Sequence, residues 1–449
     1  MNNPNVLIIL LDTASARFLS CYGYPKKSSP FIDKLASEGV RFAHCYSNGA
    51  WTPPSHASLF TGLPSIAHKM NHDHINVRTR EMFHKVRNRG QIPTLASLLS
   101  ENGYQTAGFC GNGWVSWKSN INYGFKFWNV LGRSEQKKTR ESTPQKVRGM
   151  SNNAAFAWAD TRYDSSKPYF AFINYLTPHL KRKPSEKYRK RFVKGTCPAY
   201  LHEIASRNCF GYIWNGRLKK EDIPAFEGLY AALICQTDDM IRELVRQFKK
   251  RGMMDNTIIV VCADHGDENG EHNLLDHQLC VYNTLIHVPL IVWHSSSIRR
   301  PKVEKRPVQL SDVAPTILNM VGLPQVRRKQ KQMKGLDLLR EVSKHKGSRP
   351  IISEHGVPRI IIRNALPDVT LEQYQPYLRR LKSIIYDGWK YIWSSDGADE
   401  LYNLQRDHAE TRNMIDTRPD KAGDLNKRLT RWVRSYGEEL KRDERRPAL

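Results

Sequence analysis

The sequence lacks several patterns that mark common protein classes. None of its eight cysteines form a C-x-x-C pair, which argues against a zinc knuckle or a thioredoxin-like redox site. The first residues carry no basic segment, and the apolar run Val6–Leu11 is too short for a signal-peptide core or a membrane span. We therefore expect a cytoplasmic protein with reduced thiols and no transmembrane segment.

Acidic residues are also scarce. The 449 residues include 70 Lys and Arg but only 44 Asp and Glu, so the formal net charge is +26. Eight of the cations lie close together between Lys181 and Lys194. This excess favours an anionic partner, such as a polyanionic substrate or nucleic acid, although an exposed charged helix explains the cluster equally well. The oligomeric state stays open.

Apolar runs rich in β-branched residues predict the central fold. Val6–Leu11 and Thr257–Ala263 have the pattern of strands buried on both faces of a parallel sheet, and Tyr169–Asn174 and His287–Trp293 are similar. Amphipathic helices are predicted between the strands, at Pro30–Gly39, Thr94–Gly103, Ala225–Lys250 and Asp312–Gly322. We therefore predict an α/β fold with a large, mainly parallel sheet flanked by helices.

The pattern changes beyond residue 325. Residues 326–348 are basic and poor in apolar side chains, which predicts a linker or an exposed crossing. Residues 349–449 contain short strands separated by turn residues, with Asp387-Gly388 and Asp396-Gly397 as hairpin signals. We predict a catalytic domain over residues 1–325 and a small antiparallel α+β domain over residues 349–449.

The segment Trp51–Gly62 combines a hydroxyl side chain with a helix start. Thr52 precedes two prolines and Ser55, a pattern typical of a helix N-terminus. Such a terminus attracts anions through its dipole and its unpaired N–H groups. Thr52 is therefore a candidate nucleophile beside an anion site, with a capping role for Thr52 or Ser55 as the alternative.

Two predicted inner strands end on carboxylates. Asp12 follows Val6–Leu11, and Asp264-His265-Gly266 follows Thr257–Ala263. Sites in open α/β sheets form at the carboxyl ends of strands, so Asp12, Asp264 and His265 can share one metal ion with Thr52. Oxygen and imidazole ligands suit Mn²⁺, Zn²⁺ or Ca²⁺, and coordination would activate the hydroxyl of Thr52.

With their surroundings, these residues resemble the sulfatase branch of the alkaline phosphatase superfamily. The resemblance covers nearly the whole chain and rests on ordered blocks at Asn5–Asp12, Cys21–Tyr24, Pro30–Val40, Trp51–Gly62, Thr177–His179, Asp264–Gly266, Gly270–His272, Val288–Leu290, Asp312–Thr316, Glu400–Leu404 and Glu410–Asn413. It implies the superfamily's α/β fold and a metal-dependent ester hydrolase.

The sequence departs from the family motif at the position of the nucleophile. The family motif C-x-P-S-R carries a cysteine that becomes formylglycine; here Thr52 takes that position and His56 replaces the arginine. Oxidation of threonine would give a ketone, so the site looks more like that of the threonine-nucleophile phosphodiesterase and phosphonate-hydrolase relatives. The single-metal members of this group imply one metal ion held by Asp12, Thr52, Asp264 and His265. The two-metal relatives carry a further D-x-x-x-H pattern, which is missing from this sequence.

Four further residues are candidates for contact with the substrate. The resemblance places His179 at the family's substrate-side histidine and His277 where sulfatases have a lysine, so either could protonate the leaving group. Asn112 and His56 are candidates for binding the anion. For His179, His277 and Asn112, a purely structural hydrogen bond is the alternative.

We predict a metal-dependent hydrolase of phosphate or phosphonate esters that uses Thr52 as its nucleophile. The alternative within the enzyme class is a sulfuric ester hydrolase acting through the same site. The alternative of another class is a non-catalytic protein that binds nucleic acid through its basic surface, which an intact ligand set argues against.

Overall fold

The computed structural model describes residues 3–71, 92–116, 119–130, 144–298, 300–340, 349–359 and 368–443. Its centre is an eight-stranded sheet of order β12-β2-β11-β7-β1-β6-β4-β5. The strands are β1 (Asn5–Leu11), β2 (Val40–Phe42), β4 (Gln105–Cys110), β5 (Phe127–Val130), β6 (Tyr169–Tyr175), β7 (Thr257–Ala263), β11 (Leu290–Trp293) and β12 (Lys302–Glu304). Only β11 runs against the others, which confirms the predicted mainly parallel sheet.

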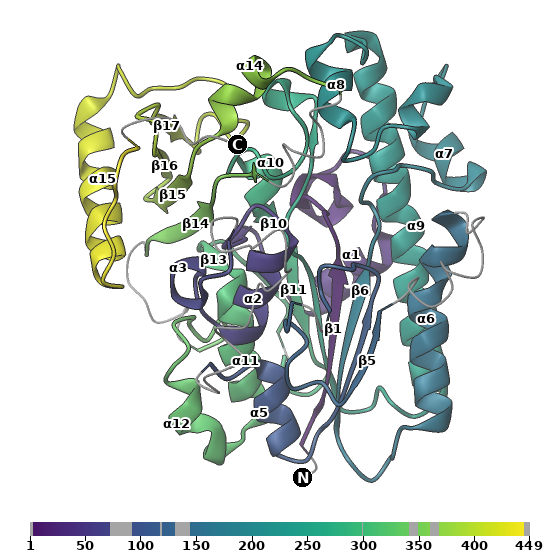
Figure 1. The fold of residues 1–449 in the computed structure, drawn as a ribbon. Coiled ribbons are helices and arrows are strands. Elements are labelled where there is room, and N and C mark those ends of the chain that lie inside the picture. The colour runs from purple at the N-terminus through teal and green to yellow at the C-terminus, as the bar shows by residue number, and fades with distance from the viewer. Residues whose placement is uncertain are drawn as a thin grey trace.

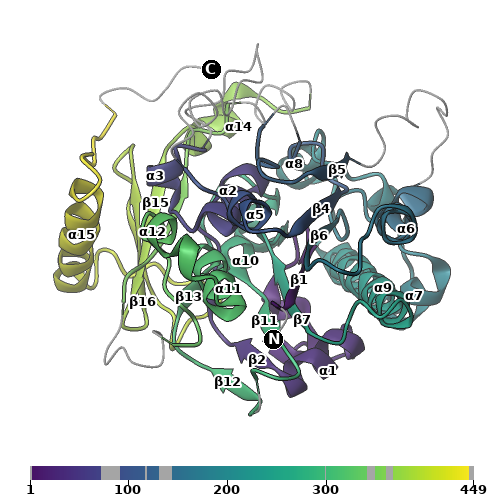
Figure 2. The same cartoon turned by 90° about the horizontal axis from the view of Figure 1, so that it is seen from below.

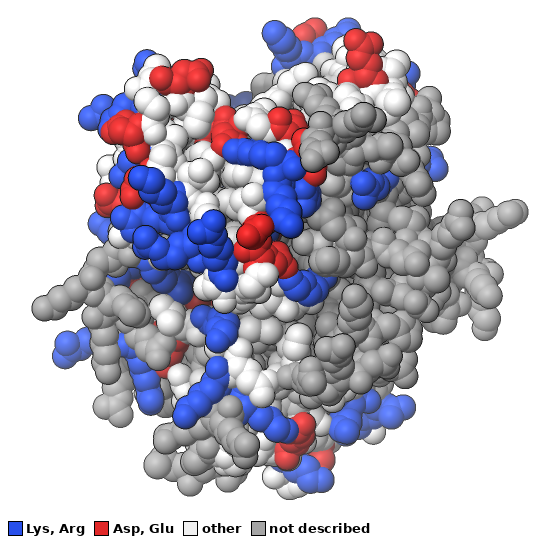
Figure 3. Space-filling model, turned by 60° about the vertical axis from the view of Figure 1, so that its left-hand side comes forward, with Lys and Arg blue, Asp and Glu red and all other residues white. Residues whose placement is uncertain are grey.

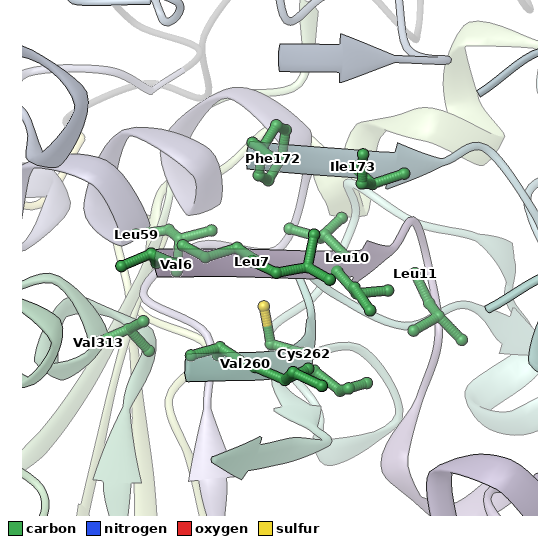
Figure 4. Packing of buried hydrophobic residues seen from close by; sticks show 14 of the residues in the cluster. Val6, Leu7, Leu10, Leu11, Leu59, Phe172, Ile173, Val260, Cys262 and Val313 are labelled. Atoms are coloured by element: carbon green, nitrogen blue, oxygen red, sulfur yellow. The ribbon is translucent and has the colours of Figure 1, made fainter. Parts of the chain in front are cut away.

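Strand β1 lies at the middle of the sheet because it is apolar on both faces. It pairs in parallel with β6 on one side and with β7 on the other, and Leu11 of β1 is in register with Ala263 of β7. Figure 4 shows Val6 and Leu7 of β1 between these two strands, with Leu59 of a neighbouring helix beside them. This register places Asp12 and Asp264 next to each other, just beyond the carboxyl ends of the two inner strands.

Helices cover both faces of the sheet (Figure 1 and Figure 2). One face carries α1 (Pro30–Glu38), α6 (Pro144–Thr161) and the long α9 (Ile223–Lys250), and the other carries α2 (Thr52–Thr61), α5 (Leu95–Glu101) and α11 (Val313–Val321). The shorter helices are α3 (Ser65–His68), α7 (Glu186–Phe192), α8 (Cys209–Trp214), α10 (Asn283–Ile286), α12 (Arg327–Gln330) and α14 (Leu371–Tyr374). Among the described residues, no helix is both long and apolar enough to cross a membrane.

The predicted strand His287–Trp293 is wrong as a single element. Pro289 divides it, because proline has no N–H to donate to a ladder of strand hydrogen bonds. The first half, β10 (His287–Val288), joins a small sheet with β3 (Cys45–Tyr46) and β13 (Val308–Gln309). The second half is β11 of the large sheet.

The C-terminal part forms a separate four-stranded antiparallel sheet, as predicted. Its strands are β14 (Ile351–His355), β15 (Leu381–Tyr386), β16 (Trp389–Ser394) and β17 (Glu400–Asn403), and helix α15 (Pro419–Arg434) packs on it. Asp387 and Gly388 connect β15 to β16, both with positive φ, as a tight hairpin turn requires.

The segment 326–340, which connects the large sheet to the C-terminal sheet, is better packed than its basic composition predicts. Val326, Met333 and Leu338 are buried against the main core. Residues 341–348, the rest of the predicted linker, lie outside the described residues.

Candidate active site

The carboxylates of Asp12 and Asp264 are buried side by side, and each has one oxygen held by N–H donors. Asp12 Oδ2 accepts hydrogen bonds from Asn112 Nδ2 at 2.9 Å and from Asn174 Nδ2 at 3.1 Å. Asp264 Oδ1 accepts from the backbone N–H groups of Thr13 and His265 at 3.1 and 3.0 Å. The other oxygen of each carboxylate has no hydrogen-bond partner among the described residues. Buried oxygens without partners are costly, so this arrangement favours a bound cation.

Thr52 is the first residue of α2 and does not cap it. The capping position is Trp51, and Ser55 Oγ instead donates to the backbone carbonyl of Trp51. Thr52 Oγ1 accepts from Asn112 Nδ2 at 3.1 Å and lies 3.3 Å from His265 Nε2. The hydroxyl therefore points into the carboxylate cluster, where a nucleophile would be needed.

The N-terminus of α2 offers fewer donors than a helix start normally does. Pro53 and Pro54 have no N–H, and the N–H of Ser55 bonds to the carbonyl of Trp51 at 3.4 Å. The predicted seat for an anion on backbone N–H groups is thus reduced to Thr52 and the helix dipole. Side chains and a cation must supply most of the anion's partners.

His265 presents a lone pair to the cluster. Its Nδ1 lies 2.9 Å from the carbonyl oxygen of Gly266, and because a carbonyl only accepts, Nδ1 carries the proton. Burial, followed by the neighbouring His277, lowers the pKa of His265 to about 3, so the ring is neutral at neutral pH. Gly266 fits here because any Cβ would collide with the carbonyl of Thr284.

These atoms fit a divalent cation. The ligand atoms of Asp12, Asp264 and His265 all lie within 4.8 Å of one another, and all three residues are fully buried. Two unpartnered carboxylate oxygens, a neutral imidazole and the hydroxyl of Thr52 form an oxygen-rich donor set with one nitrogen. Such a set suits Mn²⁺, Zn²⁺ or Ca²⁺ and does not select among them.

His277 adjoins this cluster with two carboxylates of its own. Its Nδ1 lies 2.9 Å from Asp267 Oδ1 and 2.8 Å from Asp276 Oδ1. Burial alone lowers the pKa of His277, but Asp276 and Asp267 outweigh burial and raise it well above its ordinary value. The ring is therefore a protonated imidazolium, as an acid for a leaving group requires.

A buried arginine completes this second group. Arg182 is fully buried and lies 3.3 Å from Asp267, so Asp267 has a cation on each side. Counted as ionised, the imidazolium and the guanidinium balance Asp267 and Asp276. Asp12 and Asp264 are left with two negative charges, which one divalent cation would balance.

The structure places the remaining predicted residues around the same cluster. His179 is half-buried, and its ring lies 5.3 Å from that of His277, measured between centroids. Its Nδ1 bonds to the carbonyl of Leu180, so its Nε2 is the atom left to contact a substrate. His56 is fully buried; its Nδ1 donates to the carbonyl of Thr52 at 2.9 Å and lies 3.5 Å from Asp264 Oδ2. His56 therefore supports Thr52 and Asp264, and its predicted contact with substrate stays a prediction.

Sequence reasoning missed several residues of the site. Asn174, Asp267, Asp276 and Arg182 were not predicted, although an asparagine in the apolar run Tyr169–Tyr175 is a visible signal. Thr13, which was not among the predicted site residues, also contributes to the site. Its φ of 62° is left-handed, which aims its N–H at Asp264, and Tyr230 holds this conformation by donating to the carbonyl of Thr13.

The basic segment 181–194 is less open than its composition predicts. Lys181 and Lys183 both bind Glu203, while Lys187, Arg189 and Lys190 pair with acids on α7 and α9. Elsewhere, Lys and Arg side chains spread over the face shown in Figure 3 with acidic groups among them. The segment therefore does not form an uninterrupted cationic surface.

The fold and the site together have the arrangement of a metal-dependent ester hydrolase of the α/β class. A sequence profile of the sulfatase family matches residues 4–323. The chain therefore belongs to the sulfatase family, whose members hydrolyse esters.

Similar proteins include arylsulfatase K from Bos taurus, 23% identical over 471 residues, covering 95% of this chain and 81% of that protein. Human arylsulfatase K is 22% identical and covers the same shares. Among solved structures, BT4656 in complex with its substrate D-glucosamine-2-N,6-O-disulfate aligns with a TM-score of 0.73 at 19% identity, covering 99% of this chain and 100% of that one. The phosphonate monoester hydrolase of Agrobacterium radiobacter aligns with a TM-score of 0.72 at 18% identity, covering 96% of both chains.

Proposed function

We propose that this protein hydrolyses phosphate or phosphonate esters with unmodified Thr52 as the nucleophile and one divalent cation held by Asp12, Thr52, Asp264 and His265. The position of the Thr52 hydroxyl carries the proposal. It lies 3.3 Å from His265 Nε2 and 3.1 Å from Asn112 Nδ2, inside the carboxylate cluster instead of capping its helix.

The chain's own groups supply the steps of the reaction. A bound divalent cation would favour the alkoxide of Thr52 and neutralise charge on the anion. Thr52 Oγ1 attacks phosphorus in line, and the bond to the leaving oxygen breaks while His277 or His179 donates a proton to that oxygen. Water then attacks phosphorus and the bond from phosphorus to Thr52 Oγ1 breaks. The histidine that gave its proton to the leaving oxygen regains one from this water, and the phosphoryl or phosphonyl group leaves as the free acid anion. Asn112 orients Thr52 and Asp12 throughout, because one amide group contacts both.

Threonine supports phosphoryl chemistry over sulfatase chemistry of the formylglycine type, because its oxidation cannot give an aldehyde. Phosphonate monoester hydrolases among the similar structures agree with this preference. Arylsulfatase K among the similar sequences favours the alternative, a sulfuric ester hydrolase that uses the same site.

Parallel assays distinguish these substrates. The protein, loaded in turn with Mn²⁺, Zn²⁺ or Ca²⁺, is offered an aryl phosphonate monoester, a phosphate diester and an aryl sulfate. We expect the phosphorus esters to be hydrolysed fastest, Thr52→Ala to abolish turnover while keeping metal, and Thr52→Ser to retain part of it. Thr61→Ala, at the other end of α2, is the matched control. Undiminished hydrolysis by Thr52→Ala would refute the proposal.

We also propose that the protein works in the cytoplasm and does not depend on nucleic acid. All eight cysteines are free thiols, and many cations of the segment 181–194 are paired with acids. Tight, salt-sensitive binding of nucleic acid by protein that takes up no metal would favour the non-catalytic alternative instead.

A further inference from the structure

An exposed tryptophan lies in the loop that carries Asn112, which bonds to the proposed nucleophile. Trp114 is 39% exposed and follows Asn112 by two residues in the loop after β4. Its backbone N–H donates to Asn112 Oδ1 at 2.9 Å, while the amide nitrogen of the same Asn112 bonds to Asp12 and Thr52. One asparagine thus connects the loop of Trp114 directly to the reacting hydroxyl.

A second, buried tryptophan supports this ring. Trp51 is 2% exposed and immediately precedes Thr52. The rings of Trp51 and Trp114 meet edge to face, with centroids 5.9 Å apart and an interplanar angle of 79°. This is a favourable aromatic geometry, and it holds Trp114 in place while much of its indole stays open to solvent.

We propose that Trp114 is a stacking platform for the organic group of the ester substrate, and that this group presents a flat ring face. The platform rests on the proposed function, because it serves the anion bound at Thr52. A flat ring face belongs either to the C–H side of a sugar or to an aromatic ring, and both stack on indole. A short, flexible alkyl group would gain little from it.

The test compares three phosphonate monoesters that differ only in their organic group: phenyl, glucosyl and ethyl. We expect Trp114→Ala to lower kcat/KM about tenfold for a ring ester and less than twofold for the ethyl ester. Trp114→Phe should restore most of the loss. A larger loss for glucosyl than for phenyl identifies a sugar, and the reverse identifies an aryl group. Trp432→Ala on α15 is the matched control, and melting temperatures check folding.

Equal losses for all three esters would overturn the platform, because Trp114 would then act only by supporting Asn112. Unchanged kinetics for all three would overturn it as well. If the wild type hydrolyses none of the esters, the proposed function fails. Binding of the esters, measured by calorimetry, then tests the platform independently of turnover. If Thr52→Ala binds the phenyl ester more tightly than the ethyl ester, and the additional change Trp114→Ala removes this difference, the platform is supported. Equal binding of the two esters by Thr52→Ala rejects the platform.

Discussion

Two buried groups of charges in this protein are built in opposite ways. At the junction between the two sheets, Lys390 is fully buried, with Glu410 Oε1 at 2.6 Å and the carbonyl of Val281 at 2.6 Å. The second oxygen of Glu410 accepts from the backbone N–H of Asn283 at 2.5 Å. In the candidate active site, Asp12 and Asp264 are equally buried, but among the described residues no lysine or arginine pairs with the free oxygen of either carboxylate.

This difference in pairing indicates a structural role for the Lys390–Glu410 pair and a ligand-binding role for Asp12 and Asp264. A closed ion pair stabilises the junction only while both partners are present, and it offers nothing to a ligand. Two adjacent carboxylates without a counter-ion destabilise the metal-free protein and attract a cation. We therefore expect charge removal to have opposite effects on stability in the two places.

The largest expected effect comes from Asp12→Asn. The asparagine oxygen can still accept from Asn112 and Asn174, but the negative charge is gone, so metal binding weakens and kcat falls at least about 1000-fold. The same change should raise the stability of chelator-treated protein by roughly 1 kcal/mol, since it relieves carboxylate repulsion. Ester hydrolysis and thermal melting with and without chelator measure both effects.

The exposed residue Asp255 supplies the control for this change. Asp255→Asn should alter neither activity nor the effect of metal on melting. A loss of stability in chelated Asp12→Asn would show that Asp12 is a structural carboxylate and would remove the contrast with the junction.

Glu410→Gln should destabilise the protein by about 3–5 kcal/mol. It leaves the buried ammonium of Lys390 without a counter-charge, which costs more than the pair itself contributes. Adding Lys390→Met should recover much of the loss. Denaturant unfolding measures the change, and Glu38→Gln, which disturbs only the exposed pair with Lys34, should stay within about 0.5 kcal/mol.

Asp238 is an intermediate case, because both its oxygens are bonded but no cation faces it in the contacts described. It accepts from the backbone N–H groups of Phe31 and Ile32 at 2.9 and 2.8 Å, yet burial raises its pKa to about 7. The folded state therefore holds this proton more tightly than the unfolded state. Its contribution to stability is full below about pH 4 and is lost as the pH rises through 7, by up to a few kcal/mol.

Asp238→Asn should remove this part of the pH dependence. Urea unfolding of wild type and variant between pH 4 and 8 measures it. Identical slopes in the two proteins would mean that Asp238 ionises normally in the folded state.

The smallest effect concerns Asn174, which orients Asp12 without contacting the hydroxyl of Thr52. Asn174→Leu keeps the volume and leaves Asp12 Oδ2 with Asn112 alone, so kcat/KM should fall about tenfold. Asn319→Leu removes a hydrogen bond to Asp337 in the region of α11 and should leave kinetics unchanged. A tenfold loss in both variants would indicate general loosening.

Much of the fold could be predicted because its signals are local. The apolar runs at β1, β6 and β7 have the length and composition typical of strands buried on both faces, and Asp387-Gly388 is typical of a hairpin turn. The division of 287–293 between two sheets depends on which strands lie nearby, so periodicity alone could not show it. The packed part of the linker was missed because three apolar residues among many cations give no regular pattern.

Part of the site was predictable because it, too, depends on local signals in the sequence. Asp12 and Asp264 follow strands that the parallel-sheet rule brings together, and Thr52 begins a helix. Asn174 and Arg182 come from other segments and reach the site only through tertiary packing, whereas Asp267 and Asp276 lie within three residues of the predicted Asp264 and His277. Their side chains have ordinary structural uses, and only the measured contacts with Asp12 and His277 reveal their part in the site.

The most direct test is whether Thr52 becomes covalently modified during turnover. Metal-loaded protein is mixed with a phosphonate or phosphate ester, quenched in acid within the first turnovers, and examined by intact mass and peptide mapping. We predict one transferred phosphoryl or phosphonyl group on Thr52, absent from Thr52→Ala. Active protein that never carries the group on Thr52, or carries it on another residue, would contradict the assignment of the nucleophile.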